Sequence, residues 1–218
     1  MPFAIPRAYN NWLKRLLKSQ NVFELLTLKE GDVICLTSPS LILVNMHGIL
    51  STVKKYTQHK SFIFALSTSN TLLYYRTNKS ICYHKVQALT NSYVLVVPNI
   101  DNLTDKFIRN EIRLMEFESL VLNISYLDSL ILAFSQNSIV KRVLVFLLVL
   151  AKQIGLFFED SIVISLGLSH TYLAEALGTT RVSITRSLNK LSREFILIER
   201  KKITILNPIA LVNCVLIG

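Results

Sequence analysis

The stretch from Ser169 to Leu206 constrains the fold of this 218-residue chain more than any other segment. It reads SHTYLAEALGTTRVSITRSLNKLSREFILIERKKITIL, in which two short helical patterns flank Gly178. Ser169 suits the N-cap of the first helix, and Thr179 or Thr180 suits that of the second. The glycine between them predicts a tight turn with a positive φ, which glycine adopts at little cost. The stretch therefore predicts a helix-turn-helix unit.

The apolar residues of the second helix indicate which side of it faces the domain core. Its apolar residues are Val182, Ile184, Leu188 and Leu191, of which the last three recur at the spacing of one buried face. The side chains expected to point outward are Arg181, Ser183, Arg186 and Lys190. Arginine is the most common reader of guanine O6 and N7, and a bidentate pair gives about 1–3 kcal/mol of discrimination. Arg181 and Arg186 are thus predicted base readers, with a solvated basic face as the alternative.

Two short segments after these helices predict a β-hairpin with a basic tip. Ile196–Glu199 and Lys202–Leu206 flank Arg200 and Lys201, the arrangement of a wing. Basic residues there would contact DNA phosphates, which adds affinity without sequence information. From Ser169 to Leu206, seven Lys or Arg stand against three Glu, so positive charge is concentrated locally. The residues predicted to contact DNA are Ser169, His170, Thr179, Thr180, Arg181, Ser183, Thr185, Arg186, Lys190, Arg200, Lys201 and Lys202.

A long helix is expected before this region, because residues 103–136 contain no Gly or Pro and show helical periodicity. Apolar residues at alternating spacings of three and four form a heptad seam, which is typical of a coiled-coil partner. We predict that this seam is a homodimer interface. The alternative is a helix packed along its own sheet domain, which needs the same stripe. The seam consists of Phe117, Leu120, Ile124, Leu127, Ile131 and Phe134.

Upstream of that helix, the chain shows short strand patterns separated by turn signals. They predict an antiparallel sandwich or barrel, with strands near residues 32–36, 41–46, 49–56, 61–66, 71–76, 82–89 and 93–97. A core helix is expected from Ile139 to Gly155, with a short strand at Ile162–Ser165 after it. The basic N-terminus predicts a short amphipathic helix, with a transit peptide as the alternative. The expected domains are residues 1–102, 103–137 and 138–212.

This order of sheet domain, long helix and winged helix-turn-helix resembles the CRP/FNR family of transcription regulators, and within it the nitrogen regulators of cyanobacteria and red-algal plastids. The matching stretches are FLLVLAKQIG (146–155), LSHTYLAEALGTTRVSITRSL (168–188) and KKITILNPIAL (201–211). The resemblance implies an α+β fold: an N-terminal antiparallel β-roll like that of cyclic-nucleotide-binding domains, a long dimerisation helix and a C-terminal winged helix-turn-helix. It implies a homodimeric activator of nitrogen-controlled genes that binds palindromic promoter DNA, contacts RNA polymerase, and reads bases with Arg181 and Arg186.

The effector site that the resemblance implies is missing from the sequence. Members of the family bind 2-oxoglutarate or cyclic AMP in the β-roll, where a Phe-Gly turn is expected near residues 72–75, which read LLYY here. The ligand-binding arginines fall on Ile81 and Asn123, with Asp128 as an acidic partner on the long helix. A dianion needs paired guanidinium groups or a helix N-terminus to offset its desolvation. We therefore assign no effector-binding residue and no certain cofactor, and the alternative function is a regulator with a lost or altered effector site and a different regulon.

Charge and hydropathy limit the class of partner. A formal net charge of +10 favours nucleic acid or an acidic membrane surface. Mean hydropathy is high, at +0.42, but the most apolar run, Val143–Ala151, has nine residues, against the ~20 that a membrane span needs. We therefore expect duplex DNA as the partner, and no membrane.

Other residue types argue against a metal site or an enzyme. The three cysteines lie far apart without CxxC spacing, which excludes the usual zinc and iron–sulfur spacings. His47, His59 and His84 are candidate ligands or bases, but no carboxylates are spaced to partner them, so turn or surface histidines are expected. Abundant Ile, Leu, Lys, Asn and Ser are typical of an AT-rich genome. With the resemblance, this favours the plastid stroma, and the bacterial cytoplasm is the alternative compartment.

Overall fold

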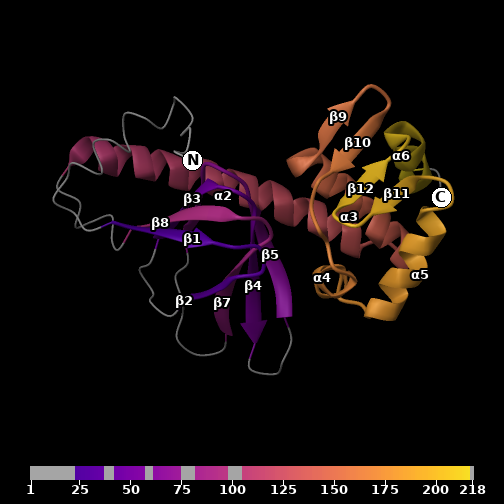
Figure 1. Cartoon of the computed structure of the whole chain (residues 1–218), viewed down its shortest axis with the longest axis horizontal. Coiled ribbons are helices and arrows are strands. Elements are labelled where there is room, and N and C mark those ends of the chain that lie inside the picture. The colour runs from indigo at the N-terminus through magenta and orange to yellow at the C-terminus, as the bar shows by residue number, and fades with distance from the viewer. Residues whose placement is uncertain (1–22, 37–41, 57–60, 75–81, 98–104, 217–218) are drawn as a thin grey trace. The chain divides into compact units, whose positions relative to one another are not determined.

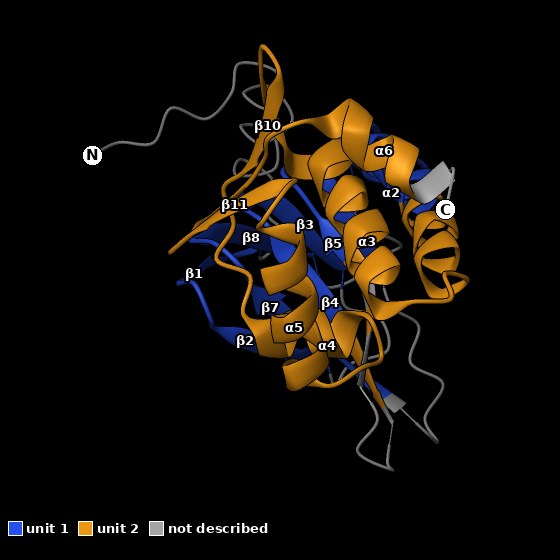
Figure 2. Ribbon diagram, turned by 90° about the vertical axis from the view of Figure 1, so that its right-hand side faces the viewer, with its two compact units in different colours: residues 1–52, 66–122 blue, residues 53–65, 123–218 orange. Residues whose placement is uncertain are grey.

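The computed structural model describes residues 23–36, 42–56, 61–74, 82–97 and 105–216 (Figure 1). The chain divides into two compact units, shown in Figure 2: unit 1 comprises residues 1–52 and 66–122, and unit 2 comprises residues 53–65 and 123–218. The predicted N-terminal helix, His59, Tyr75 and Ile81 lie outside the described residues.

Two four-stranded sheets make up the N-terminal part of the chain. Their strand orders are β1-β8-β3-β6 and β2-β7-β4-β5, and β8 pairs antiparallel with both β1 and β3. Seven strands lie close to their expected positions, whereas β1 was not predicted. The strands are β1 (Glu24–Leu28), β2 (Val33–Leu36), β3 (Ile42–His47), β4 (Leu50–Tyr56), β5 (Ser61–Ser67), β6 (Thr71–Tyr74), β7 (Cys82–Ala88) and β8 (Ser92–Val97).

The turn after β3 illustrates how local sequence determines this sheet. Gly48 has a φ of +94°, and a Cβ there would collide with Ser92, so glycine is required on both grounds. The fully buried Asn45 donates hydrogen bonds to the carbonyls of Gly48 (3.1 Å) and Thr68 (3.0 Å). One side chain thus holds two neighbouring turns in register.

Helix α2 (Lys106–Phe134) has a buried face in each unit. In unit 1, Ile108 and Ile112 are fully buried against the β1-β8-β3-β6 sheet, in a cluster with Ile42 and Val97. The Ser119 hydroxyl accepts a hydrogen bond from the Leu72 amide at 2.7 Å, which attaches α2 to β6. In unit 2 the buried residues of α2 are Tyr126, Leu130 and Ala133. By length and composition alone, α2 is the one described helix that is apolar enough to cross a membrane.

Unit 2 contains the remaining helices and a third four-stranded sheet, in the order β11-β12-β10-β9. The elements are α3 (Ile139–Ile154), β9 (Leu156–Phe158), β10 (Ser161–Ile164), α4 (His170–Ala176), α5 (Arg181–Leu191), β11 (Ile196–Glu199), β12 (Lys202–Ile205) and α6 (Pro208–Leu216). Helix α3 begins at the N-cap Ser138 and ends at Gly155, where a Cβ would collide with the carbonyl of Ala151. Close packing, rather than a positive φ, therefore requires that glycine.

The predicted fold class is confirmed: the fold is α+β, with antiparallel sheets first, a long helix next and a helix-turn-helix with a wing at the end. Strands β1 and β9 and helix α6 were not predicted. The domain boundaries at residues 102 and 137 stay a prediction.

Candidate DNA-binding site

The two helices of the predicted helix-turn-helix unit are α4 and α5, and local sequence determines where each begins. The Ser169 hydroxyl caps α4 by accepting from the Tyr172 amide at 3.0 Å. Thr180 caps α5 by accepting from the Ser183 amide at 3.2 Å, which decides between the two candidate threonines. Between the helices, Gly178 has a φ of +58°. The predicted capping residues and the glycine turn are confirmed.

Helix α5 presents opposite faces to the core and to solvent. Ile184, Leu188 and Leu191 are buried, as the apolar spacing predicted, and α3 packs against this helix. The outward side chains Arg181, Arg186 and Lys190 are exposed, and Ser183 is half-buried. Val182 is 59% exposed, so it belongs to the outward face and not to the core. Sequence reasoning grouped it with the apolar residues, although its position two residues before Ile184 indicates the other side of the helix.

A hydrogen-bond chain joins the start of α4 to the middle of α5. His170 Nδ1 lies 2.8 Å from the Thr185 hydroxyl, which in turn donates to the Arg181 carbonyl at 3.0 Å. His170 and Thr185 are half-buried, so both remain accessible from the outward face of α5. The structure thus links three predicted contact residues, His170, Thr185 and Arg181, across two helices.

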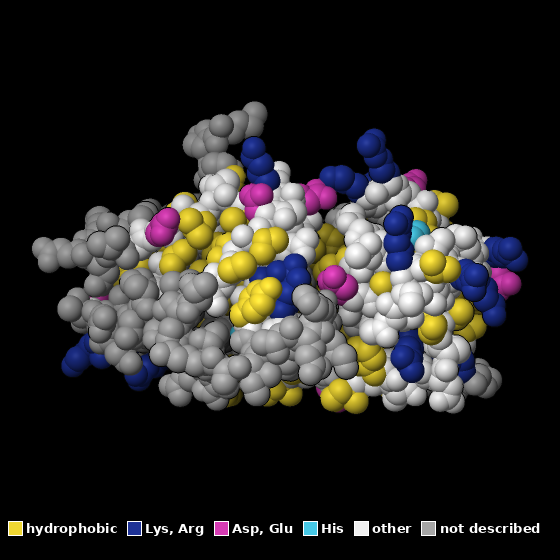
Figure 3. Space-filling model, turned by 90° about the horizontal axis from the view of Figure 1, so that it is seen from below, with side chains coloured by type: hydrophobic (Ala, Val, Ile, Leu, Met, Phe, Trp, Pro, Cys, Tyr) yellow, Lys and Arg dark blue, Asp and Glu magenta, His cyan; other side chains and the backbone are white. Residues whose placement is uncertain are grey.

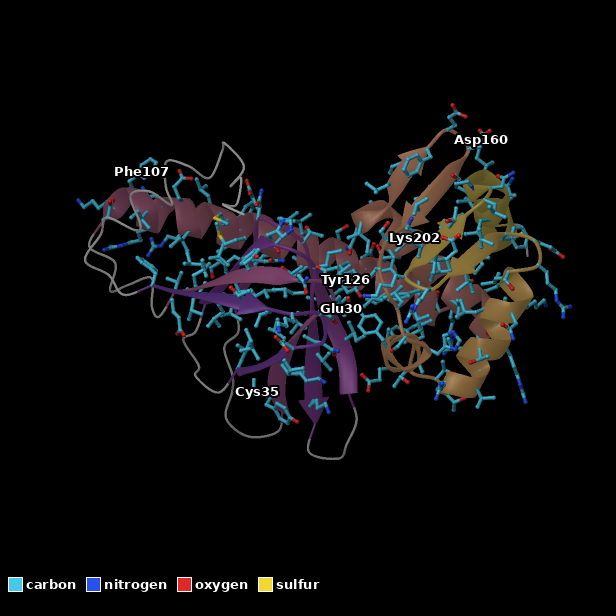
Figure 4. All side chains as sticks on the ribbon, in the orientation of Figure 1. Glu30, Cys35, Phe107, Tyr126, Asp160 and Lys202 are labelled. Carbon is cyan, nitrogen blue, oxygen red and sulfur yellow. The ribbon has the colours of Figure 1, made fainter. Side chains whose placement is uncertain are left out.

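The wing is the hairpin of β11 and β12. These strands pair antiparallel, with Ile196 opposite Ile205 at one end and Glu199 opposite Lys202 at the other. Ile196, Ile203 and Ile205 face the core of unit 2, whereas Arg200, Lys201 and Lys202 are exposed at the tip. Figure 4 labels Lys202 on β12. The predicted hairpin is confirmed, and its tip has three exposed basic side chains.

Several basic side chains lie on the surface around these elements. On the right-hand part of Figure 3, which belongs to unit 2, Lys and Arg side chains stand out, with a histidine among them. The other predicted contact residues, Ser169, Thr179, Thr180 and Ser183, are exposed or half-buried as well. Among the described residues, no three His, Cys, Asp or Glu side chains group together to hold a metal ion.

The predicted heptad seam on α2 lies apart from the buried face of that helix. Phe117, Leu120, Ile124 and Ile131 are exposed, and Leu127 and Phe134 are half-buried. The residues that pack on the sheet are different ones, Ile108 and Ile112 among them. The chain's own sheet domain therefore does not account for the seam.

A capped helix pair with a glycine turn, an outward basic face and a basic wing define a winged helix-turn-helix DNA-binding protein. The model of the Crp-like helix-turn-helix domain matches residues 141–214. A protein of Porphyra purpurea, named as a putative HTH-type transcriptional regulator, is 28% identical over 206 residues, covering 93% of this chain and 86% of the relative. The global nitrogen regulator of Synechococcus elongatus is 36% identical over 131 residues, covering 59% of this chain and 58% of the relative.

The fold is also similar to that of a solved structure. A CRP/FNR family transcriptional regulator of Thermus thermophilus superposes with a TM-score of 0.63 at 18% identity, covering 88% of this chain and 98% of that one. Residues 141–214 thus match a Crp-like helix-turn-helix domain, and the chain has the fold of a CRP/FNR family regulator. It is a DNA-binding transcription regulator related to the global nitrogen regulators, and its relatives are regulators and not enzymes.

Proposed function

We propose that this chain is a homodimeric, sequence-specific regulator that binds palindromic promoter DNA and activates genes under nitrogen control. The observation that supports it most is the outward face of α5, where Arg181 and Arg186 stand on a helix whose other face is buried. A recognition helix of this kind enters the major groove, and its outward side chains then meet base edges.

The chemistry of this face suits base reading. Arg181 and Arg186 offer planar forks for guanine O6 and N7, and the exposed methyl groups of Val182 suit the methyl group of thymine. The hydroxyl of Thr180 and the wing residues Arg200 and Lys201 suit phosphate oxygens. In this arrangement the helix supplies specificity and the wing supplies affinity.

The exposed seam on α2 supports the homodimer. Ile124 is 66% exposed, and its seam neighbours one and two turns away are apolar as well. Large apolar side chains aligned along one helix are removed from water when a second copy packs against them. Two copies would place two copies of α5 on one duplex, about one helical turn or a multiple of it apart.

Relatives supply the biological setting of the proposal. The relatives above include a global nitrogen regulator of a cyanobacterium, which supports nitrogen control. Activation implies contact with RNA polymerase. The relative from the red alga Porphyra purpurea supports the plastid stroma as the compartment, with a bacterial cytoplasm as the alternative.

In vitro selection of bound DNA from a random pool tests the proposal. We expect a palindromic consensus for the wild-type protein and a relaxed consensus for Arg181→Ala, because the bidentate pair that it removes is worth about 1–3 kcal/mol at one base pair. Lys201→Ala is the matched control: affinity should fall evenly across sequences. The slope of log K against log salt should decrease by ~0.9, since this variant neutralises one phosphate fewer. Equal affinity of wild-type protein for all sequences would refute the proposal.

A second candidate function is a family regulator whose effector site is lost or altered. One structural observation favours it: Leu72 and Leu73 are buried in strand β6, where relatives are expected to have a Phe-Gly turn. Asn123, at the position of an expected arginine, has an uncharged side chain. A selection repeated with and without 2-oxoglutarate tests this second function, because a regulator with a lost effector site should bind the same pool of DNA in both.

A further inference from the structure

The hydrogen bonds between α4 and α5 determine which nitrogen of His170 bears a proton. A threonine hydroxyl has one hydrogen, and Thr185 uses it to donate to the Arg181 carbonyl, since a carbonyl can only accept. The Thr185 oxygen must therefore accept from His170, so the hydrogen between them belongs to Nδ1. In its neutral form the imidazole then has a bare Nε2, which cannot donate.

Protonation changes what this side chain can offer to DNA. A histidinium ion has a hydrogen on both nitrogens, so Nε2 becomes a charged donor while Nδ1 keeps its bond to Thr185. Histidine side chains change charge between about pH 5 and 8. A charged N–H donor is a good ligand for a phosphate oxygen, whereas a bare ring nitrogen and a phosphate oxygen repel each other.

The position of His170 places it at the edge of the face that would meet DNA. It opens α4, and in a helix-turn-helix the first helix crosses the DNA backbone while the second lies in the groove. On α5, the charged residues within one turn of Thr185 are Arg181 and Arg186, both cationic. On α4, the titratable residues are the buried Tyr172 and the exposed Glu175, five positions along from His170.

We propose that His170 is a pH-dependent phosphate ligand, with Nδ1–H held by Thr185 and Nε2 donating to a DNA phosphate only when the ring is protonated. The inference rests on the proposed function. It adds a proton to the binding equilibrium, so DNA affinity rises as the pH falls. Recognition of bases by α5 is unaffected, because the contact is with the backbone.

Fluorescence anisotropy at pH 6 and pH 8, at constant ionic strength, tests this inference. We expect wild-type affinity to be roughly tenfold higher at pH 6 for each subunit that makes the contact. The salt slope should be steeper by ~0.9 per contact at the lower pH. His170→Gln should abolish both differences, since a glutamine amide does not titrate. His47→Gln is the matched control: His47 lies on β3 in unit 1, and this variant should retain the wild-type pH dependence.

An independent measurement is made on the free protein. Nitrogen-15 NMR of the histidine rings should show the neutral His170 protonated on Nδ1 in the wild type and in Thr185→Ser, and the proton moving to Nε2 in Thr185→Val. A neutral ring protonated on Nε2 in the wild type would overturn the inference. So would a pH dependence that persists in His170→Gln, while the proposed function would stand. If the wild type binds no DNA at either pH, the proposed function fails and this inference fails with it.

Discussion

At the scale of single residues, Tyr126 is a polar group whose burial is not compensated in the core of unit 2. Its side chain is 1% exposed, and the hydroxyl has no hydrogen-bond partner among the described residues. Figure 4 labels it on α2. Burial, followed by the charge of Tyr172, raises the pKa of Tyr126 well above its ordinary value. A buried tyrosine that stays protonated while its unfolded counterpart ionises makes stability depend on pH.

We predict that the free energy of unfolding falls as the pH rises above about 10, because only the unfolded chain then releases this proton. Tyr126→Phe should raise that free energy by about 1 kcal/mol at neutral pH, since it removes an unpaired buried donor. It should also weaken the alkaline decline. Urea titrations at pH 7 and pH 10.5 measure both effects. The exposed Tyr83 supplies the control, Tyr83→Phe, and equal pH profiles for the wild type and Tyr126→Phe would contradict the prediction.

The sequence predicts best those residues whose position in a helix cap or turn allows only a few residue types. Ser169, Thr180 and Gly178 were predictable because a cap needs an acceptor and a left-handed turn needs glycine. Tyr126 was not, because its burial depends on helices distant in sequence. Val182 was placed with the apolar residues, and its exposure follows from the register of α5 rather than from its side chain.

At the scale of elements, the apolar periodicity of α2 predicted one apolar face, whereas the structure shows both a buried face and an exposed apolar seam. The sequence showed one apolar stripe and left two explanations for it, a partner helix or the chain's own sheet. The sheet packs against other residues, Ile108 and Ile112, whose side chains are buried. The stripe from Phe117 to Phe134 remains largely exposed. Strands β1 and β9 were missed because their sequences, ELLTL and LFF, do not alternate between apolar and polar residues.

We predict that Ile124→Glu converts the protein to a monomer and lowers its affinity for a palindromic site by at least about tenfold, because a buried charge opposes packing of two seams. Analytical ultracentrifugation measures the first effect and anisotropy the second. Leu122→Glu is a matched control on the same helix, 55% exposed but outside the seam, and it should leave the dimer intact. A wild-type monomer at micromolar concentration would contradict the prediction.

The same helix raises the question of a membrane, and its charges argue for the dimer. From Ser119 to Phe134 the one charged residue is Asp128, and by length and composition alone α2 could cross a membrane. The preceding turns contain Arg113, Glu116 and Glu118. A liposome flotation assay distinguishes dimer formation through α2 from membrane binding by α2. Wild-type protein that floats with the liposomes would favour membrane binding.

At the scale of the whole molecule, the DNA-binding end is the part that the family model matches. That model covers residues 141–214, whereas the relative from Porphyra purpurea aligns over 93% of this chain. The reason is physical: DNA presents the same grooves and phosphates to every such regulator, so few sequences suit a helix-turn-helix. A sheet that binds a small ligand is constrained only by that ligand.

We therefore predict that neither 2-oxoglutarate nor cyclic AMP at millimolar concentration changes DNA affinity by more than about twofold. An anion buried without a paired cation would pay a desolvation cost of several kcal/mol, and the cost is larger for the dianion 2-oxoglutarate than for cyclic AMP, which has one negative charge. Here Leu72 and Leu73 continue a buried strand, and Asn123 is uncharged. Isothermal titration calorimetry of the protein alone measures the binding of each ligand, and anisotropy measures the effect of the ligand on DNA affinity. If a ligand changes DNA affinity by some factor, DNA must change the affinity for that ligand by the same factor. The Synechococcus regulator, assayed in parallel, is the reference, and micromolar binding of either ligand by this chain would show that its sheet recognises the effector through other residues.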